Sequence, residues 1–456
     1  MVEMCHKELE ELRTEDFLSP NPVLCYGAGG AFYGIAPYLF ACEINVVGVI
    51  DANKSGQVDI AEKNIPIYST DEALKTFGED AVVIITIANL SVVREVEGVL
   101  VKKGFHKETI FDMNVWTWLT IPVSDGKSYC PSIGEYIQFY SAGLSKCCNV
   151  GVVEPYICEW FIKGQPLLQS TENYLEKRDF YLIEMSRGYV PLYCQGCRFL
   201  SDDSEKWRDK ISQFIITDHS ACNADCVYCP DACSHPRRKA DFSDEERFEN
   251  VVDSFELIEQ RQIFAKDTMV QLASGEITIL PQREKLLSLV KNNPTHHVEI
   301  FSNCFKFDMH IQEILQSNPK SFLQCDLDAG TAETYIKVKG FNRFEIVKDN
   351  LKKYHAVGTV KIKYIILPGW NDSDEDFKGM IDFCKELELK ELMLSPEYVA
   401  SKEGDSTKKR ELHFSTGRMM ALCEKKGIRT ILPGNFWKKE DVIMSKRFMK
   451  EVMELL

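Results

Sequence analysis

The 456-residue sequence has little that would place it in a membrane or on a nucleic acid. No segment reaches the roughly eighteen consecutive apolar residues of a spanning helix. The opening MVEMCHKELEELRTEDF has neither the basic nor the apolar region of a secretory signal. The 54 basic residues are outnumbered by 69 acidic ones, for a net charge of -15. We therefore expect a cytoplasmic protein without general affinity for membranes or nucleic acid.

Internal repeats and low-complexity tracts are also missing. Hydrophobic residues make up 45 % and charged residues 27 % of the chain, which is ordinary for a globular protein and excludes wholesale disorder. Cysteine, in contrast, is plentiful, with 17 residues. A disulfide framework is not expected in a leaderless chain, so the useful question is which cysteines are spaced for a metal.

The order of apolar runs predicts an α/β fold in three parts. Residues 1–119 alternate expected strands with helical patterns, which predicts a Rossmann-like parallel sheet. Residues 120–205 are irregular and rich in cysteine, which predicts a small cluster-binding domain. Residues 206–456 return to the βα alternation and predict a partial (β/α)6 barrel of TIM type. The expected strands are PVLCYGAGG, INVVGVID, AVVIITIAN and ETIFDM in the first part, and SQFIITD, TMVQLAS, HVEIF, SFLQCDLD, VKIKYIIL and ELMLS in the last.

Directly after the first strand of the last part, ACNADCVYCP places Cys222, Cys226 and Cys229 in a C-x3-C-x2-C spacing. Three thiolates on one loop can bind three irons of a 4Fe–4S cluster and leave the fourth iron open to a small molecule. Tyr228, just before the last cysteine, can shield such a cluster. The competing interpretations are a zinc knuckle or chance clustering.

This motif resembles that of the radical S-adenosylmethionine (radical SAM) superfamily. The resemblance covers roughly residues 211–430 and implies that the open iron chelates SAM, which a reduced cluster cleaves to a 5′-deoxyadenosyl radical. At the end of the second strand, Ser274, Gly275 and Glu276 resemble the Gly-Gly-Glu motif of the family, whose acidic residue holds the SAM ammonium.

Two further stretches carry the resemblance. FSNC resembles the Thr-Asn-Gly element, with Asn303 kept and Cys304 in place of glycine. CDLDAGT resembles a Ser-Leu-Asp-x-Gly-Thr stretch, in which Asp328 matches the aspartate. Asp326 stands in the place of serine and could accept hydrogen bonds from ribose hydroxyls. Cys325 and Cys304 lie near strand ends where substrate radicals form, so either thiol could donate a hydrogen atom; the alternative is a small buried residue.

The middle cysteines predict a second cluster. Cys130 and Cys148, spaced around Gly143, resemble the first half of the SPASM/twitch auxiliary-cluster pattern, although this segment precedes the barrel. Cys194 and Cys197 add a C-x2-C pair, and four thiolates close one 4Fe–4S cluster. A zinc site with the same four ligands, or no metal at all, are the alternatives.

The N-terminal stretch GAGGAFYG is a candidate phosphate-binding loop, with Gly27, Gly29, Gly30 and Gly34. Asp51 ends the second expected strand, where an acid can bond ribose hydroxyls. A phenylalanine holds the third glycine position of the dinucleotide fingerprint. The stretch resembles the Rossmann-like domain found beside sugar-modifying enzymes of surface-polysaccharide pathways. A nucleotide or nucleotide sugar, an NAD-type cofactor, and a scaffold role without ligand stay open.

Together these features predict a radical SAM enzyme that abstracts hydrogen from a small molecule, a sugar or nucleotide sugar. A peptide- or protein-modifying maturase is the alternative. Such maturases often carry a winged-helix module, whereas residues 1–119 indicate a Rossmann-like domain. The resemblance also implies an external reductant such as flavodoxin or ferredoxin. A degenerate SAM-binding scaffold is disfavoured because the cysteine triad is intact.

Overall fold

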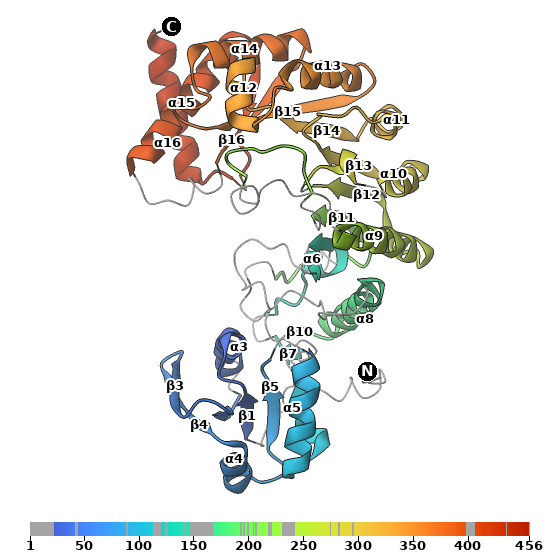
Figure 1. The fold of residues 1–456 in the computed structure, drawn as a ribbon, viewed down its shortest axis with the longest axis vertical. Helices are drawn as coiled ribbons and strands as arrows, with labels where there is room; N and C mark the ends of the chain where they lie inside the picture. The colour runs from blue at the N-terminus through green and yellow to red at the C-terminus, as the bar shows by residue number, and fades with distance from the viewer. Residues whose placement is uncertain are drawn as a thin grey trace. The chain divides into compact units, whose positions relative to one another are not determined.

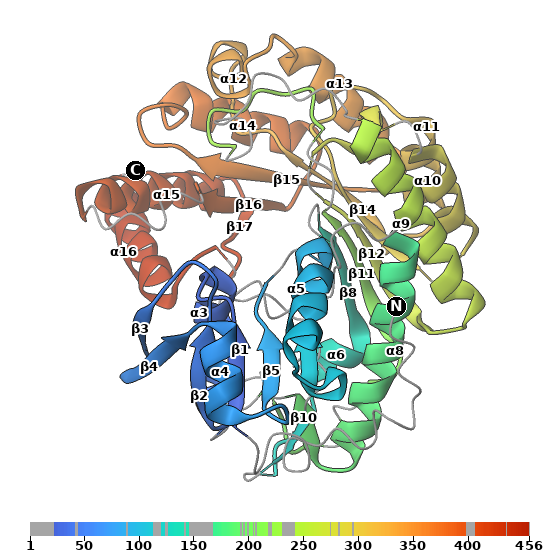
Figure 2. The ribbon, with the colours of Figure 1, turned by 60° about the horizontal axis from the view of Figure 1, so that its bottom comes forward.

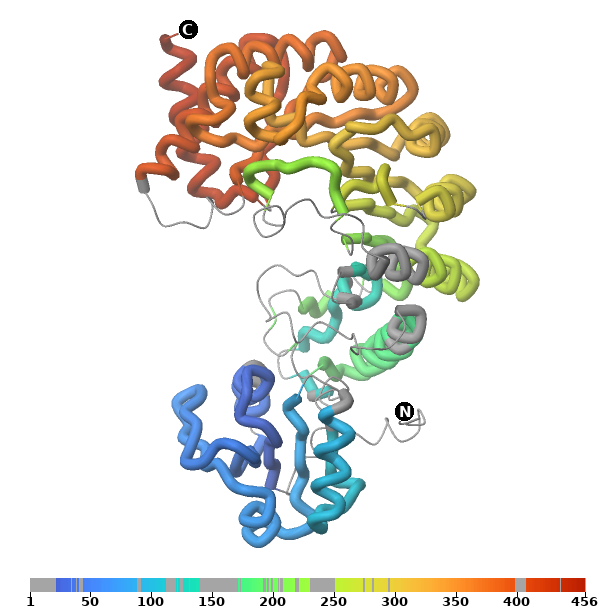
Figure 3. Tube along the Cα trace, viewed as in Figure 1, coloured from blue at the N-terminus to red at the C-terminus, as the bar shows by residue number. Residues whose placement is uncertain are grey.

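The computed structural model divides into two compact units, one of Met1–Gln138 with Ala142–Ile211 and one of Phe139–Ser141 with Ser212–Leu456 (Figure 1). Coloured tube in Figure 3 marks the residues that are described. The description leaves out residues 1–21, 42–43, 88–89, 113–119, 124–125, 141–142, 146–166, 192–193, 195–196, 198–199, 204, 206–207, 218–220, 230–241, 274, 281–282, 294–295, 398–405, 435 and 456.

The first unit contains a six-stranded sheet in the order β3-β4-β2-β1-β5-β6. Its strands are β1 (Val23–Tyr26), β2 (Val46–Ile50), β3 (Gly56–Ile60), β4 (Lys63–Tyr68), β5 (Val82–Ile85) and β6 (Ile110–Asp112). All neighbours pair in parallel except β3 and β4. The four strands expected from the sequence are present. The β3–β4 hairpin was not expected, because Ala61 and Glu62 form its turn with positive φ values of 48° and 62° instead of the usual Asn-Gly pair.

Helices cover this sheet and bury its apolar side chains. They are α3 (Gly30–Ala41), α4 (Thr70–Phe77) and α5 (Leu90–Lys103), with a short 3-10 turn η1 (Lys107–Thr109) before β6. Ser69 and Glu72 form a reciprocal capping box at the start of α4. Alternate strand residues such as Leu24 and Val83 pack with Val96 of α5 in one core.

The middle segment contains more helix than its irregular sequence predicts. Its elements are β7 (Thr120–Pro122), α6 (Pro131–Glu135), β8 (Tyr136–Tyr140), β9 (Gly143–Ser145), α8 (Leu167–Ser186) and β10 (Tyr189–Pro191), of which β7 and β10 pair antiparallel. The helix α8 has Lys177, Arg178 and Glu184 among its buried residues. Charged side chains on a buried face blur the apolar periodicity by which a helix is predicted. Arg178 donates from Nε and Nη2 to the carbonyl of Gly134 at 3.1 and 2.8 Å.

The second unit is built on a curved sheet whose strands run in the order β17-β16-β15-β14-β13-β12-β11, with β8 beyond β11. These strands are β11 (Ile211–Thr217), β12 (Phe264–Leu272), β13 (His297–Phe301), β14 (Phe322–Asp326), β15 (Thr359–Ile366), β16 (Glu391–Pro396) and β17 (Arg429–Ile431). The ladders from β12 to β17 are all parallel. The predicted α/β fold class is confirmed, and the six expected barrel strands are joined by the short β17.

Figure 2 shows the helices that follow β11 to β15 along the outer side of this curved sheet. They are α9 (Phe242–Gln260), α10 (Arg283–Asn292), α11 (Met309–Ser317), α12 (Ala332–Lys339), α13 (Phe344–His355) and α14 (Asp374–Glu386); η6 (Ile277–Ile279), α15 (Ser406–Lys425) and α16 (Lys439–Leu455) complete the unit. Parallel strands bring the loops at their carboxyl ends to one edge, and the predicted motif residues follow those ends. Within the described ranges no helix is long and apolar enough to cross a membrane.

Candidate active site and cluster-binding loop

The three motif cysteines lie on one loop after β11, and Cys222, Cys226 and Cys229 are all free, partly exposed thiols. A turn closes the loop, with the Cys229 amide donating to the Cys226 carbonyl at 3.0 Å. Among the described residues, no three His, Cys, Asp or Glu side chains are arranged to hold one metal ion. A 4Fe–4S cluster does not require the three thiolates to converge on one ion, because each thiolate binds a different iron.

Two N–H groups point at the first of these sulfurs. The Ala224 amide donates to Cys222 Sγ at 3.5 Å, and the Asn303 side-chain amide lies 3.7 Å from the same atom. Burial raises the pKa of Cys222 to about 11, against the lowering effect of the Ala224 bond. The thiol is therefore protonated at neutral pH, and binding of a metal would release that proton. Hydrogen bonds to sulfur are among the features that tune iron–sulfur clusters.

Asn303 joins the end of β13 to the cluster loop. Its side-chain amide also donates to Asn223 Oδ1 at 2.6 Å, and its own Oδ1 accepts from the Phe305 amide at 2.9 Å. The structure thus brings the predicted Asn303 beside the predicted Cys222. Gly275 follows β12 with φ +54°, a left-handed conformation that favours glycine. Ser274 lies outside the described residues.

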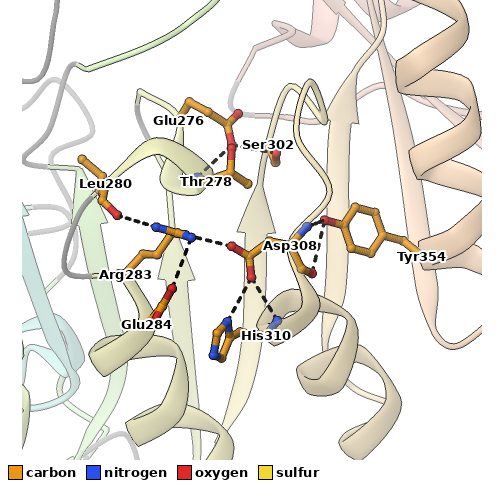
Figure 4. A network of polar contacts seen from close by, with 9 residues as sticks. All are labelled: Glu276, Thr278, Leu280, Arg283, Glu284, Ser302, Asp308, His310 and Tyr354. Atoms are coloured by element: carbon orange, nitrogen blue, oxygen red, sulfur yellow. Dashed lines mark hydrogen bonds and ion pairs between the residues drawn. The ribbon is translucent and has the colours of Figure 1, made fainter.

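Glu276, the predicted ligand of the SAM ammonium, is fully buried, and protein donors surround its carboxylate. Oε1 accepts from the amide and hydroxyl of Thr278 at 3.0 and 2.7 Å and from the Ser302 hydroxyl at 2.9 Å (Figure 4). Oε2 accepts from the Asn303 amide at 2.7 Å. Oε1 thus accepts three bonds and Oε2 one, which leaves acceptor capacity on Oε2. In this arrangement Glu276 ties the ends of β12 and β13 together.

A second polar network lies beside the first in Figure 4. Asp308, buried before α11, accepts from Arg283 Nε at 2.8 Å and from the His310 amide at 2.9 Å. Its own amide donates to the Tyr354 hydroxyl at 2.7 Å. Burial opposes the charge of Asp308, but Arg283 and the His310 amide outweigh it and lower the pKa of this carboxyl. The network fixes the segment between β13 and α11 that carries Asn303.

Asp328 takes part in a buried cluster with Tyr228 and Lys339. Its Oδ2 accepts from the Tyr228 hydroxyl at 2.5 Å and from Lys339 Nζ at 2.6 Å, and Nζ also lies 2.5 Å from the phenol oxygen. Its Oδ1 accepts from the Ile365 amide at 2.6 Å. Asp328 has φ +56°, so the surrounding contacts hold it in a conformation that non-glycine residues rarely adopt. Tyr228 and Asp328, predicted separately, are thus brought together.

Asp326, the predicted ribose acceptor, is ion-paired in this structure. Lys363 Nζ lies 2.8 Å from its Oδ2, and Gln324 Nε2 lies 3.2 Å from its Oδ1. The Asp326 side chain keeps 30 % of its surface exposed. The Lys363 ammonium also lies 5.1 Å from the Phe436 ring centroid.

The two predicted hydrogen-atom donors are neighbours. Cys304 and Cys325 are both buried, and the hydrogen bond that the Cys325 S–H donates to Cys304, together with burial, holds the pKa of the Cys325 thiol well above its usual value. Cys304 occupies the position of the family glycine and has φ +59°. A left-handed conformation explains why glycine suits this position.

The auxiliary-cluster cysteines are described in part. Cys130 lies at the start of α6, and Cys194 and Cys197 form a turn in which the Cys197 amide donates to the Cys194 carbonyl at 2.9 Å. An antiparallel bridge between Tyr129 and Ser201 draws the two segments together. Cys148 lies outside the described residues.

The N-terminal glycine loop has the expected place between β1 and α3. Gly27 has φ +104°, Gly29 precedes the helix, Gly30 begins it and Gly34 lies within it. Asp51, which the sequence predicts as a ribose acceptor, bonds to the protein in this structure. Its Oδ2 accepts from the Ala28 amide at 2.8 Å, and its Oδ1 accepts from the Asn53 and Lys54 amides at 2.8 and 3.0 Å. Burial opposes the charge, but these backbone bonds lower the pKa of Asp51.

Sequence reasoning missed Lys339. The only local signal is a lysine directly before Gly340, the left-handed residue that ends α12. Its partner Tyr228 lies more than a hundred residues earlier in the chain, so no short motif contains both.

The segment that contains this site matches a known protein family. A family model described as the radical SAM superfamily matches residues 216–384, the segment from β11 to α14 that holds the cysteine loop. Residues 216–384 of the chain therefore match a radical SAM domain. This class implies a 4Fe–4S cluster and SAM as cofactors, and an external reductant. A search of curated proteins found no match.

Several solved structures are similar to this chain, each with a TM-score below 0.5. SuiB from Streptococcus suis, bound to its precursor peptide SuiA, has 14 % identity and a TM-score of 0.40, over 57 % of this chain and 54 % of its own. SuiB bound to SAM has 14 % identity and a TM-score of 0.38, over 67 % and 73 %. The methyltransferase TsrM from Kitasatospora setae has 13 % identity and a TM-score of 0.31, over 83 % and 73 %. The chain thus spans about half the length of the first of these, and at such scores none of their substrates carries over to it.

Proposed function

We propose that Cys222, Cys226 and Cys229 bind a 4Fe–4S cluster whose fourth iron is left for SAM. The observation that carries this proposal is the arrangement of three free thiols on one loop, with two N–H groups directed at Cys222 Sγ. The donor set fits the cofactor, because three thiolates are one fewer than a closed cluster needs. When bound and reduced, this cofactor pair supplies a 5′-deoxyadenosyl radical that abstracts hydrogen from a substrate.

The chain's own residues would hold the geometry and keep water away from the radical. Asn303 orients the cluster loop, and Glu276 fixes the strand ends on which Asn303 lies. We also propose that Cys304 and Cys325 are hydrogen-atom donors. A donor must carry its S–H proton, and the raised pKa of Cys325 keeps that proton in place.

For the substrate, we propose a small molecule, a sugar or nucleotide sugar, with electrons from a flavodoxin- or ferredoxin-like reductant. The support is the glycine loop of the first unit, where a strand end and a helix start face the same place, as in phosphate sites. Asp51 Oδ2 accepts only one hydrogen bond in the described contacts, so acceptor capacity is left for a ribose hydroxyl.

The test is anaerobic reconstitution of the full chain with iron, sulfide, SAM and a reductant. Cys226→Ala should abolish formation of 5′-deoxyadenosine and lower the iron content by about four per chain, because the cluster loses one of three ligands. The matched control is Cys25→Ala, which removes a buried thiol of β1 in the other unit and should keep both readouts. Undiminished 5′-deoxyadenosine from Cys226→Ala would refute the proposal.

The same assay separates the substrate classes. Nucleotide sugars and unmodified peptides are offered in parallel, and mass spectrometry follows substrate-dependent 5′-deoxyadenosine. Stimulation by a nucleotide sugar supports the small-molecule reading, whereas stimulation by peptides alone would replace it with a maturase.

A further inference from the structure

Lys339 has a buried ammonium group to which the proposed chemistry assigns no role. Its side chain is 2 % exposed and that of its partner Asp328 is fully buried. Burial opposes the charge, but Asp328 outweighs it and holds the pKa of Lys339 well above its usual value, so the ammonium persists inside the protein. Removing charges from water is costly, and apolar residues of similar size often replace a buried ion pair without loss of stability.

The backbone around Lys339 clamps the cluster loop on both sides of Cys226. The Asp225 amide donates to the Lys339 carbonyl at 3.1 Å, and the Val227 amide donates to the Val338 carbonyl at 3.0 Å. Gly340 permits this approach, because a Cβ there would lie 2.9 Å from Asp225 Cβ. The end of α12 is thus in register with the middle ligand of the loop.

The side-chain ammonium of Lys339 also lies beside the cluster loop. Lys339 Nζ lies 2.5 Å from the hydroxyl of Tyr228, which is two residues after Cys226 and directly before Cys229. The buried ammonium is thus held against the segment that carries Cys226 and Cys229.

We propose that Lys339 is a positioning residue that raises the reduction potential of the cluster at Cys222, Cys226 and Cys229. This inference rests on the proposed cluster. Reduction adds a negative charge to the cluster, and a fixed ammonium near one ligand favours the reduced state; net charge and hydrogen bonds to sulfur are known determinants of such potentials. Lys339 would thereby make the one-electron reduction that precedes SAM cleavage easier for the external donor.

An electrostatic role predicts shifts of opposite sign for the two partners. Lys339→Met removes the positive charge and should make the midpoint potential more negative. Asp328→Asn removes the negative charge and should make it more positive. In Lys339→Met with Asp328→Asn both charges are gone, and the potential should return toward the wild-type value. A merely structural role would shift both single variants in one direction or in neither.

The experiment is a redox titration of the reconstituted protein without SAM, followed by the electron paramagnetic resonance signal of the reduced cluster. At a poise where the wild-type cluster is half reduced, Lys339→Met should lower the reduced-to-oxidised ratio about tenfold, which is about 59 mV for one electron. Lys339→Arg keeps the charge and should stay near the wild type. Lys337→Met is the matched control, because this exposed lysine of the same helix pairs with Glu333 at 2.8 Å.

The outcomes separate this inference from the proposed function. If the wild type forms no cluster whose signal changes with SAM, the proposed function fails. If that cluster forms and Lys339→Met leaves the potential unchanged, or Asp328→Asn shifts it in the same direction as Lys339→Met, the inference about Lys339 is overturned. Thermal unfolding of the metal-free variants shows whether they fold. If Lys339→Met is unfolded, two other comparisons of the midpoint potential decide the question. The potential of Asp328→Asn should lie above that of the wild type, and the potential of the double variant should lie below that of Asp328→Asn.

Discussion

At the scale of single residues, His296 is the clearest case of a polar group buried without compensation. Its ring lies 4.9 and 5.7 Å from the ring centroids of Phe264 and Phe255. Both ring nitrogens are buried and lack a hydrogen-bond partner within the described part of the chain. Burial lowers the pKa of His296; Glu259 opposes this effect and His297 adds to it. The folded protein therefore holds His296 neutral.

This burial predicts a loss of stability in mild acid. Between the usual histidine pKa, about 6.5, and the lowered folded value, the unfolded chain binds a proton that the folded chain excludes. Stability contributed by this group is full above about pH 6.5 and falls as pH decreases, by at most about 1.4 kcal/mol per unit. We expect His296→Leu to reduce this slope of the urea-unfolding free energy between pH 7.5 and 5.5. His296→Gln, polar but not titratable, should reduce it equally, and an unchanged slope in both variants would contradict the prediction.

At the scale of elements, one carboxylate fastens α12 to α14. Asp376, in the first turn of α14, accepts at Oδ1 from the amides of Gly330 and Thr331 at 3.1 and 3.2 Å. Its Oδ2 accepts from the hydroxyls of Thr334 and Ser373, each at 2.8 Å. A helix start needs acceptors for its free N–H groups, and here the neighbouring helix supplies one. The position of α12, and of Lys339 at its end, depends on this contact.

Asp376→Ala should therefore destabilise the second unit by about 2–4 kcal/mol, because several buried donors lose their acceptor. Asp374→Ala is the matched control two residues earlier. That side chain is 83 % exposed and pairs with Arg418 at the surface, so the expected change is within about 0.5 kcal/mol. Urea unfolding followed by circular dichroism measures both variants, and equal effects would refute the assignment.

The elements also show where sequence reasoning works and where it stops. Buried parallel strands are often continuous apolar runs, so β1 (VLCY) and β5 (VVII) could be predicted from their composition. The sequence also places the Cys222 loop and Asn303 at the ends of expected strands, and the structure brings the two together. Hydrogen bonds between residues far apart in the chain could not be predicted from the sequence. The bonds of Lys339 to Tyr228 and of Asp51 to Ala28 depend on the folded backbone geometry. The helix α8 was missed because Lys177, Arg178 and Glu184 interrupt its otherwise largely apolar buried face.

At the scale of the whole molecule, the candidate cluster ligands divide between the two units. Cys222, Cys226 and Cys229 belong to the second unit, whereas Cys130, Cys194 and Cys197 belong to the first. Two sites in separate compact units should be lost independently when their ligands are removed. The proposal of an auxiliary cluster can therefore be tested by measuring the iron content per chain in cysteine variants.

We expect the reconstituted wild type to hold about eight irons and eight sulfides per chain. Replacing the three cysteines of the second unit with alanine should leave about four irons, whose spectrum does not change with SAM, because four thiolates leave no open iron. Replacing Cys194 and Cys197 should remove the other four and keep the signal that responds to SAM. A triple variant with one zinc and no iron would identify the middle cysteines as a structural zinc site. A wild type with four irons and no zinc would show that they bind no metal. Either result would leave the radical SAM cluster standing, since its ligands lie in the other unit.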